Sequence, residues 1–329
     1  MSSRTQLRAT ARLRDPEPTM AAALELVEAR LAQQIQSREG LLTDIATYLI
    51  GSGGKRVRPA VSLLIFRACG GRRLDDIVDV ATALELIHSA SLLHDDIIDG
   101  SAVRRGKDSA FRKYGMANAL VAGDFIFSRA FQLCGRFEEK LINWAAEACI
   151  ALTEGEIMQG RLRHNPSVTL DDYWEIISRK TASIFQQGAR TAAYLAGAAE
   201  SMIEAMAECG YHVGMTFQVV DDLLDVEGTE ARVGKPVGLD LRDGNPSLPI
   251  VLALGRDPEV ARAFQKRALS DSEVAAVLER IRRSGVLPEV RTLANDHADR
   301  ARRCLDVLSA SPDKDHLLAL IDQLINRSN

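Results

Sequence analysis

Residues 74–99, LDDIVDVATALELIHSASLLHDDIID, decide the fold class of this chain. Apolar or small side chains recur there at spacings of three and four residues, which is the pattern of one helix face. They are Ile77, Val80, Ala81, Leu84, Ile87, Ser91 and Leu92. No proline, the residue that most often breaks a helix, occurs between Pro59 and Pro166. The stretch therefore predicts one helix about 39 Å long, at ~1.5 Å per residue.

The same helical periodicity continues on both sides, and strand signals are nearly absent. Further helices are predicted over 20–36, 40–50, 58–69, 118–134, 140–161, 170–197, 201–225, 247–254, 272–284 and 288–308. The breaks between them are short and contain Gly, Pro or Asn, and none has the length or low complexity of a domain linker. We therefore expect a flexible tail over residues 1–19 and a single all-α domain over 20–329.

The composition of the 329 residues, 46% hydrophobic and 26% charged, suits a globular protein and excludes disorder as the main state. A net charge of −4 removes the general electrostatic case for binding nucleic acid. Apolar runs are soon interrupted by charge, as Asp124 interrupts residues 119–127, so stable membrane insertion is not expected. The five cysteines form no CxxC pair and suit reduced thiols in a cytoplasmic protein.

The first fourteen residues contain four arginines and no acid. This composition weakly resembles an organelle transit peptide, and it also suits a solvated tail. We favour the tail because the segment has little apolar face.

A short acidic pattern occurs twice, as DDIID at 95–99 and DDLLD at 221–225. At this spacing the outer carboxylates of each cluster share one face of a helix. Apolar residues flank both clusters, so the carboxylates would raise one another's pKa unless cations neutralise them. All-oxygen ligands without a nearby cysteine favour Mg²⁺. Two unrelated charged helix faces are the alternative, and the repeated spacing makes it the weaker one.

Basic residues near these clusters suggest sites for two polyanions. The candidate anion ligands are Lys55, Arg56, Arg58, Arg104, Arg105, Lys107, Lys180, Thr181 and Lys235. His88 lies on the same helix stripe as Asp95 and Asp99, and Gln218 stands in the same relation to the second acidic cluster. A lone histidine is usually structural, but this one points where the carboxylates point.

Motifs that contain these residues follow one another along the chain: GGKRVRP at 53–59, ELIHSASLLHDDIIDGSAVRRG at 85–106, KTA at 180–182, FQVVDDLLD at 217–225 and GKPVGLDL at 234–241. Over residues 53–254 the chain resembles the trans-isoprenyl diphosphate synthases, also called polyprenyl synthetases. The resemblance implies a bundle of long helices around a deep apolar cavity, with the two aspartate motifs facing each other at its mouth. It also implies a homodimer.

The resemblance implies a role for each site residue. Three Mg²⁺ ions, with Mn²⁺ as a substitute, would bridge an allylic diphosphate to Asp95, Asp96, Asp99, Asp221, Asp222 and Asp225. Arg104, Lys180 and Lys235 would bind the same diphosphate directly. Isopentenyl diphosphate would bind through Lys55, Arg58, His88 and Arg105, and Phe217, Gln218 and Thr181 would border the reacting carbons. The expected catalytic set is Asp95, Asp96, Asp99, Lys180, Thr181, Gln218, Asp221 and Asp222.

The implied reaction is ionisation of the allylic C–O bond, attack by the double bond of isopentenyl diphosphate, and loss of a proton. No protein nucleophile is needed, and an apolar cavity suits the reaction because it excludes water. Two positions depart from the family pattern: Asn245 stands where many members have a lysine, and Ala102 where many have an acid. The first departure removes one expected phosphate contact.

Product length in the family is set largely by the side chains about 5.4 Å, or one helical turn, below the first aspartate motif. Here they are Ala90 and Ser91, which are small and leave the cavity open. A long-chain product such as an octaprenyl diphosphate is therefore expected, with Phe125, Phe127 and Phe131 as candidates for the cavity floor. A shorter geranylgeranyl or farnesyl product is the alternative.

Two other protein classes share part of this pattern. A class I terpene cyclase uses the same ionisation, but it lacks the GGKRxRP site and mixes Asn, Ser or Thr with Glu in its second metal motif. A non-catalytic subunit of a heteromeric synthase keeps the fold, but usually loses aspartates or arginines that this chain retains. Activity of the isolated protein would exclude the subunit.

Overall fold

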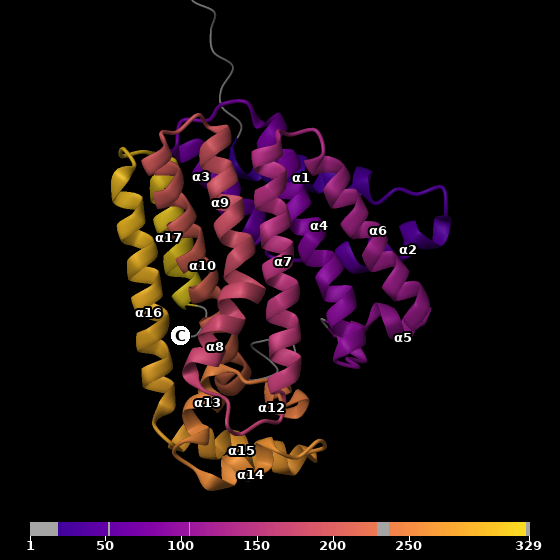
Figure 1. Ribbon diagram of the computed structural model, residues 1–329, viewed down its shortest axis with the longest axis vertical. Coiled ribbons are helices and arrows are strands. Elements are labelled where there is room, and N and C mark those ends of the chain that lie inside the picture. Colours follow the sequence, from indigo (N-terminus) through magenta and orange to yellow (C-terminus); the bar gives the residue numbers. More distant parts are fainter. Residues whose placement is uncertain (1–18, 52, 105, 229–236, 327–329) are drawn as a thin grey trace, which may run out of the picture.

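The computed structural model describes residues 19–51, 53–104, 106–228 and 237–326, and within them the chain is almost entirely helical (Figure 1). The longer helices are α1 (Met20–Gln34), α2 (Gly40–Ile50), α3 (Val57–Ala68), α4 (Leu74–Ile98), α6 (Met116–Cys134), α7 (Glu139–Leu162), α9 (Ser183–Leu195), α10 (Glu200–Glu227), α15 (Asp271–Arg283), α16 (Val286–Cys304) and α17 (Pro312–Asn326). The shorter ones are α5 (Ala110–Tyr114), α8 (Leu170–Ile177), α12 (Leu239–Asp243), α13 (Leu248–Leu254) and α14 (Pro258–Phe264). The predicted all-α fold class is confirmed.

The helices predicted from periodicity are present, with ends that differ by a few residues. Helices α5, α12, α14 and α17 were not predicted, and neither was a hairpin that pairs β1 (Val103–Arg104) with β2 (Lys107–Asp108). Helices α5 and α12 and the two strands have five residues or fewer, which is too short to show a period, and α14 has only seven. The sequence of α17 did carry a signal, because Leu317, Ile321 and Leu324 are buried at helical spacing.

Helix α4 lies inside the bundle, where it packs against α1, α3, α6 and α9. Asp75 and Asp76 occupy its first turn, where carboxylates interact favourably with the helix dipole. Among the described helices, α4 alone is long and apolar enough to cross a membrane by length and composition. However, 83% of its apolar window is buried inside the protein. The apolar composition is therefore that of a core helix.

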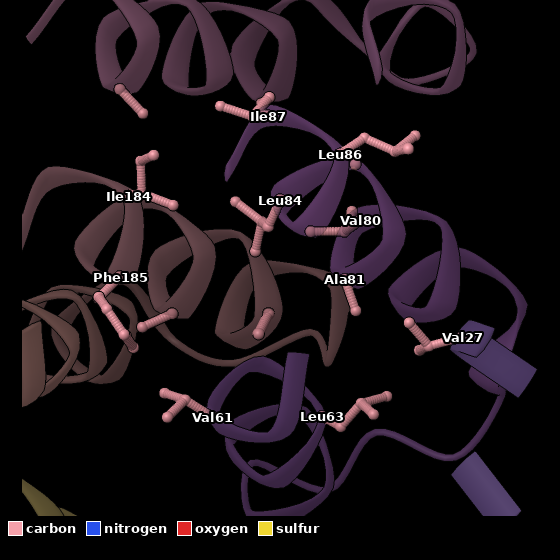
Figure 2. Close-up of a cluster of buried hydrophobic side chains, with 14 of the residues drawn as sticks. Val27, Val61, Leu63, Val80, Ala81, Leu84, Leu86, Ile87, Ile184 and Phe185 are labelled. Carbon is pink, nitrogen blue, oxygen red and sulfur yellow. The ribbon is translucent and has the colours of Figure 1, made fainter. Parts of the chain in front are cut away.

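Two hydrophobic cores hold the helices together. The larger core lies among α1–α4, α6, α7, α9, α10 and α17, and Figure 2 shows part of it, including Leu84 of α4, Ile184 of α9 and Val61 of α3. The smaller core lies among α8, α10, α16 and the helices α12–α15, and these last four gather at the lower end of the bundle in Figure 1. Helix α10 joins the two cores, since it contributes Val213 to the larger and Val219 to the smaller.

The helical run from α8 to α9 is not the single regular helix that the sequence predicted over 170–197. A π-helical segment, Ser178–Ala182, separates the two, and the N–H of Ser183 bonds to the carbonyl of Ser178. Gly155 of α7 permits the close approach of this segment, because a Cβ there would lie 2.6 Å from the backbone nitrogen of Lys180. Short π segments within helices are rare and are frequent at functional sites.

Candidate active site

A cavity of about 900 Å³ lies among α4, α8–α10 and the loops that follow α4 and α12. All six aspartates of the two acidic clusters line it: Asp95, Asp96, Asp99, Asp221, Asp222 and Asp225. Helix α4 carries the first cluster at its C-terminal end and α10 carries the second near its own C-terminal end. The fold thus brings two sequence segments more than a hundred residues apart to one site.

The first cluster combines a carboxylate that is paired closely with an arginine, Asp96, and one whose nearest cation lies farther away, Asp95. Asp96 is fully buried and accepts the Arg104 guanidinium, with Nε–O distances of 2.8 and 2.9 Å. Burial raises the pKa of Asp95 to about 7, and the charges of Glu156 and Asp99 add to this effect although Lys180 opposes it. Asp95 is therefore the carboxylate of this cluster that most lacks a compensating cation.

The second cluster is tied to the surrounding protein. Asp222 accepts hydrogen bonds from the hydroxyl of Tyr173 at 2.7 Å, from Nε2 of Gln218 at 2.8 Å and from the backbone N–H of Leu248 at 3.0 Å. Burial outweighs these bonds and raises the pKa of Asp222 to about 7. Asp225 accepts the backbone N–H groups at the start of α12, and Asp221 is exposed to the cavity.

The six carboxylates share a cavity but not one coordination sphere. Within the residues that the structure describes, no three side chains of His, Cys, Asp or Glu gather closely enough to hold a metal ion. The physical reason lies in the hydrogen bonds above, because Asp96, Asp222 and Asp225 each turn toward donors of the protein. Cation binding by this set would require these side chains to exchange partners.

The π segment presents Lys180 and Thr181 to the cavity between the two clusters. The Lys180 ammonium donates to Oε1 of Gln159 at 2.7 Å, pairs with the buried carboxylate of Glu156 and lies 3.9 Å from Asp95. Thr181 donates its hydroxyl to Oε1 of Gln218 at 2.9 Å. An ammonium held by two acids and an amide is well placed to exchange one of them for a phosphate oxygen.

Arg56 and Arg58, at the start of α3, have different roles. Arg58 lines the cavity, where its guanidinium lies 4.9 Å from the ring centroid of Phe185 and 5.6 Å from that of Phe217. Burial lowers the pKa of Arg58, and no described residue accepts a hydrogen bond from its buried Nε. Arg56 instead bonds to Glu28 and Glu85 and so fixes the turn.

The other predicted residues are distributed as follows. His88, Phe217, Gln218 and Ala102 line the cavity. Lys55 is exposed and is not among the residues that line the cavity. Arg105 and Lys235 lie outside the described residues.

The positions predicted to set product length differ from one another. Ser91 lines the cavity and donates its hydroxyl to the carbonyl of His88 at 2.9 Å. Ala90 is fully buried in the larger core and does not line the cavity. The phenylalanines expected at the floor are not among the lining residues either: Phe125 and Phe127 are half-buried and Phe131 is exposed.

A second, apolar cavity of about 30 Å³ lies farther along α4. Val80, Ala83, Leu84 and Ile87 of α4 line it, and Ile184 of α9 lines both cavities. Figure 2 shows Leu84 and Ile184 facing the space between α4 and α9. The wall between the two cavities is thus built from aliphatic side chains, which can change rotamer more readily than backbone can move.

The sequence interpretation missed four residues that line the cavity or contact residues that line it. Glu156, Gln159 and Tyr173 have polar side chains near Lys180 or Asp222, and Arg163 reaches Asp99 and Asn245. Polar residues that recur on the cavity side of the predicted helix over 140–161 could have pointed to Glu156 and Gln159. No spacing rule would have singled out the other two.

Comparison with known proteins gives a consistent set of similarities. The polyprenyl synthetase family model matches residues 39–282. The chain is 34% identical over 307 residues to octaprenyl diphosphate synthase of Escherichia coli, which covers 92% of this chain and 94% of that protein. Among solved structures, a polyprenyl synthase from Caulobacter crescentus complexed with calcium and isoprenyl diphosphate has a TM-score of 0.90 at 34% identity, over 94% of this chain and 96% of that chain. A decaprenyl diphosphate synthase from Rhodobacter capsulatus has a TM-score of 0.88 at 30% identity, over 94% and 97%.

Proposed function

The chain belongs to the polyprenyl synthetase family and is a prenyltransferase, and on that premise we propose that it condenses isopentenyl diphosphate onto an allylic diphosphate to give a long all-trans polyprenyl diphosphate. The observation that carries the proposal is that both acidic clusters line one cavity together with Arg58 and Lys180. The leaving diphosphate and the attacking double bond must meet in one space that excludes water. The walls of this cavity carry carboxylates that can bind cations and basic side chains that can bind anions.

Membership of the family implies a divalent cation, which we assign as Mg²⁺. The candidate ligands fit a hard cation, because all of them are carboxylate oxygens. Burial raises the pKa values of two of them, Asp95 and Asp222. The holding residues would be Asp95, Asp96 and Asp99 on α4 and Asp221, Asp222 and Asp225 on α10. When bound, the cation supplies Lewis-acid stabilisation of charge on the departing diphosphate. The Caulobacter relative, whose structure is complexed with calcium and isoprenyl diphosphate, supports the use of a divalent cation.

The cations of the chain divide between the two substrates. Lys180 and Arg104 bind the allylic diphosphate, and Lys235 joins them. Each of the first two leaves an acid to do so, Glu156 in one case and Asp96 in the other. Arg58 binds isopentenyl diphosphate together with Lys55, His88 and Arg105, and the buried Nε of Arg58 supports this assignment.

Neutral side chains orient the reacting carbons. Gln218 spans from the Thr181 hydroxyl to the Asp222 carboxylate, so its amide cannot rotate without losing a bond. Phe217 offers the face of its ring to the developing positive charge, in the way that it already faces the Arg58 guanidinium. The proton is lost to the departed diphosphate, since no protein base is required.

A long product would extend along α4 from the main cavity toward the small apolar one. Val80 lies fifteen residues before Asp95 in the sequence, which corresponds to about 22 Å of helix. Ser91 leaves the way open, and the aliphatic wall formed by Leu84, Ile87 and Ile184 would part to admit the growing tail. The octaprenyl and decaprenyl relatives support a product of this class.

The assembly that we propose is a cytoplasmic homodimer of single-domain subunits. Helices α6 and α7 carry exposed aliphatic side chains, among them Met116, Leu120, Ile150 and Ile157, with exposed fractions between 47% and 69%. A second copy of the chain would cover these residues. Helix α10, which runs through both cores, supports treating residues 20–329 as one unit.

The test is an assay of the purified full chain with Mg²⁺, isopentenyl diphosphate and farnesyl diphosphate, followed by sizing of the products. We expect polyprenyl diphosphates longer than geranylgeranyl diphosphate, and none when EDTA removes the cation. Products that end at geranylgeranyl diphosphate would support the shorter-chain alternative. A folded protein that forms no product with Mg²⁺ present would favour the non-catalytic subunit.

A further inference from the structure

Arg163, the residue after α7, contacts two residues at one corner of the main cavity. Its Nε donates to Oδ1 of Asn245 at 3.0 Å, and its Nη2 forms an ion pair with the carboxylate of Asp99. Both partners line the cavity. The side chains of Arg163 and Asp99 are 17% and 16% exposed, so the ion pair is largely shielded from bulk water. Arg163 therefore joins the end of α4 to the loop between α12 and α13.

Negative charge collects in this corner. Asp243 lines the cavity and lies close enough to interact with the charges of both Asp99 and Arg163. Asn245 is neutral and only 8% exposed, so it fixes the guanidinium without neutralising it. A guanidinium presents five N–H donors in a planar fork, and the bond to Asn245 uses one of them. Of the other donors, Nη2 is directed at the carboxylate of Asp99, which belongs to the first acidic cluster.

We propose that Arg163 binds the allylic diphosphate, with Asn245 as the residue that positions its guanidinium. The inference rests on the proposed function, because Asp99 would be a ligand of the divalent cation in the loaded site and would then release Nη2 of Arg163. The released N–H groups match two oxygens of a phosphate, while Nε–H stays on the amide of Asn245. Bidentate, charge-assisted hydrogen bonds of this kind are among the strong ones in proteins.

The first experiment compares Arg163→Gln with Arg161→Gln, which removes an exposed arginine two residues earlier on α7. For Arg163→Gln we expect the KM for farnesyl diphosphate to rise about ten- to hundredfold, as for loss of a hydrogen bond to a charged group, while the KM for isopentenyl diphosphate stays the same. The dissociation constant of an unreactive allylic thiodiphosphate with Mg²⁺, measured by calorimetry, should rise by a similar factor. Arg161→Gln should change none of these quantities.

The second experiment introduces a positively charged side chain at Asn245, the hydrogen-bond partner of Arg163. Because Nε of Arg163 and Oδ1 of Asn245 are 3.0 Å apart, an ammonium introduced by Asn245→Lys would lie in the same corner. Adding Asn245→Lys to Arg163→Gln should recover at least a tenfold loss of analogue affinity, which a merely structural role of Arg163 would not allow. If the double variant does not fold, Arg163→Lys must bind the analogue at least tenfold more tightly than Arg163→Gln.

Two results would overturn the inference: equal changes in the KM of both substrates for Arg163→Gln, or analogue affinity unchanged in that variant. Failure of the proposed function looks different, because the wild-type protein would then form no prenyl product even where it binds the analogue.

Discussion

Tyr173 donates its phenolic hydroxyl to the carboxylate of Asp222 at 2.7 Å, with both side chains buried. Burial and the adjacent carboxylate raise the pKa of Tyr173 well above its usual value, so the hydroxyl remains a donor at any working pH. Tyr173 of α8 thus orients Asp222 of α10, a carboxylate that we propose as a cation ligand. Partners of this kind hold a ligand in position and affect metal affinity when they are removed.

Replacing Tyr173 by Phe should therefore weaken cation binding. Loss of the hydrogen bond raises the pKa of Asp222 further, because a donor that favours the ionised form is gone. We expect the Mg²⁺ concentration for half-maximal activity to rise about tenfold, the effect of roughly 1.4 kcal/mol. A Mg²⁺ titration of activity measures it. Tyr194→Phe, in a ring pair with Trp144, is the control and should leave the titration unchanged.

Gly155→Ala tests the contact that places the π segment. The new Cβ would lie 2.6 Å from the nitrogen of Lys180, so the segment must move, and overpacking of this kind costs about 1–3 kcal/mol. We expect a lower free energy of unfolding in urea and a lower kcat. Gly160→Ala on the same helix meets nothing within 4 Å and should instead stabilise by about 0.5–1 kcal/mol. Equal effects of the two substitutions would contradict the proposed contact.

Ser91→Phe should shorten the product, because Ser91 lines the main cavity on the way to Leu84 and the apolar cavity beyond. Chromatography of the prenyl alcohols after dephosphorylation gives the length distribution. Ser201→Phe makes the same change at an exposed site on α10 and should leave the distribution unaltered. An unchanged product with Ser91→Phe would mean that the tail takes another route.

A histidine pair makes stability depend on pH. The Nδ1 atoms of His212 and His297 are 2.9 Å apart, and burial first, with nearby positive charge second, lowers both pKa values to about 4. The unfolded chain binds protons as the pH falls below about 6.5 and the native chain does not, so the free energy of unfolding should decrease between about pH 6.5 and 4. The charged groups around the pair are Glu208, Asp296, Arg300 and Arg303.

Urea unfolding at several pH values measures this slope. His297→Gln should reduce it, whereas His316→Gln, at an exposed position of α17, should not. The same slope in wild type and His297→Gln would show that other groups cause the acid sensitivity.

Ile157→Asp tests the proposed subunit interface. Ile157 is 69% exposed in the single chain, and burying an isoleucine contributes about 1.5–3 kcal/mol. A charge at this position should lower the dimer fraction in sedimentation experiments, while Leu26→Asp, on the exposed side of α1, should not. A wild-type chain that sediments as a monomer at micromolar concentration would disprove the homodimer.

The sequence predicted the helices and the two acidic clusters because both depend on local spacing. It did not predict Tyr173 or Arg163, whose partners lie 49 and 82 residues away along the chain. Spacing also does not reveal where a carboxylate turns once the chain has folded. Asp96 and Asp225 have the spacing of cation ligands, yet they accept hydrogen bonds from Arg104 and from the backbone of α12.

The difference between Ala90 and Ser91 has a similar cause. Both positions were predicted from their distance to Asp95 along the helix, but the side chains of neighbouring residues on a helix point about 100° apart. Only the packing of α4 against α9 decides which of them borders the cavity, and that packing depends on residues throughout both helices. A sequence motif can therefore indicate the level of a site along a helix without indicating its direction.

The π segment also limits how the length of the chain can change. Such a segment holds one residue more than a regular α-helical turn, so deleting a single residue within Ser178–Ala182 would convert it to regular helix and could even improve its hydrogen bonding. The same deletion would turn every preceding residue by about 100° relative to α9. Lys180 and Thr181 would then face away from one acidic cluster or the other. Homologues that keep both residues should therefore tolerate insertions and deletions in the loops at either end of this helical run, but none inside it.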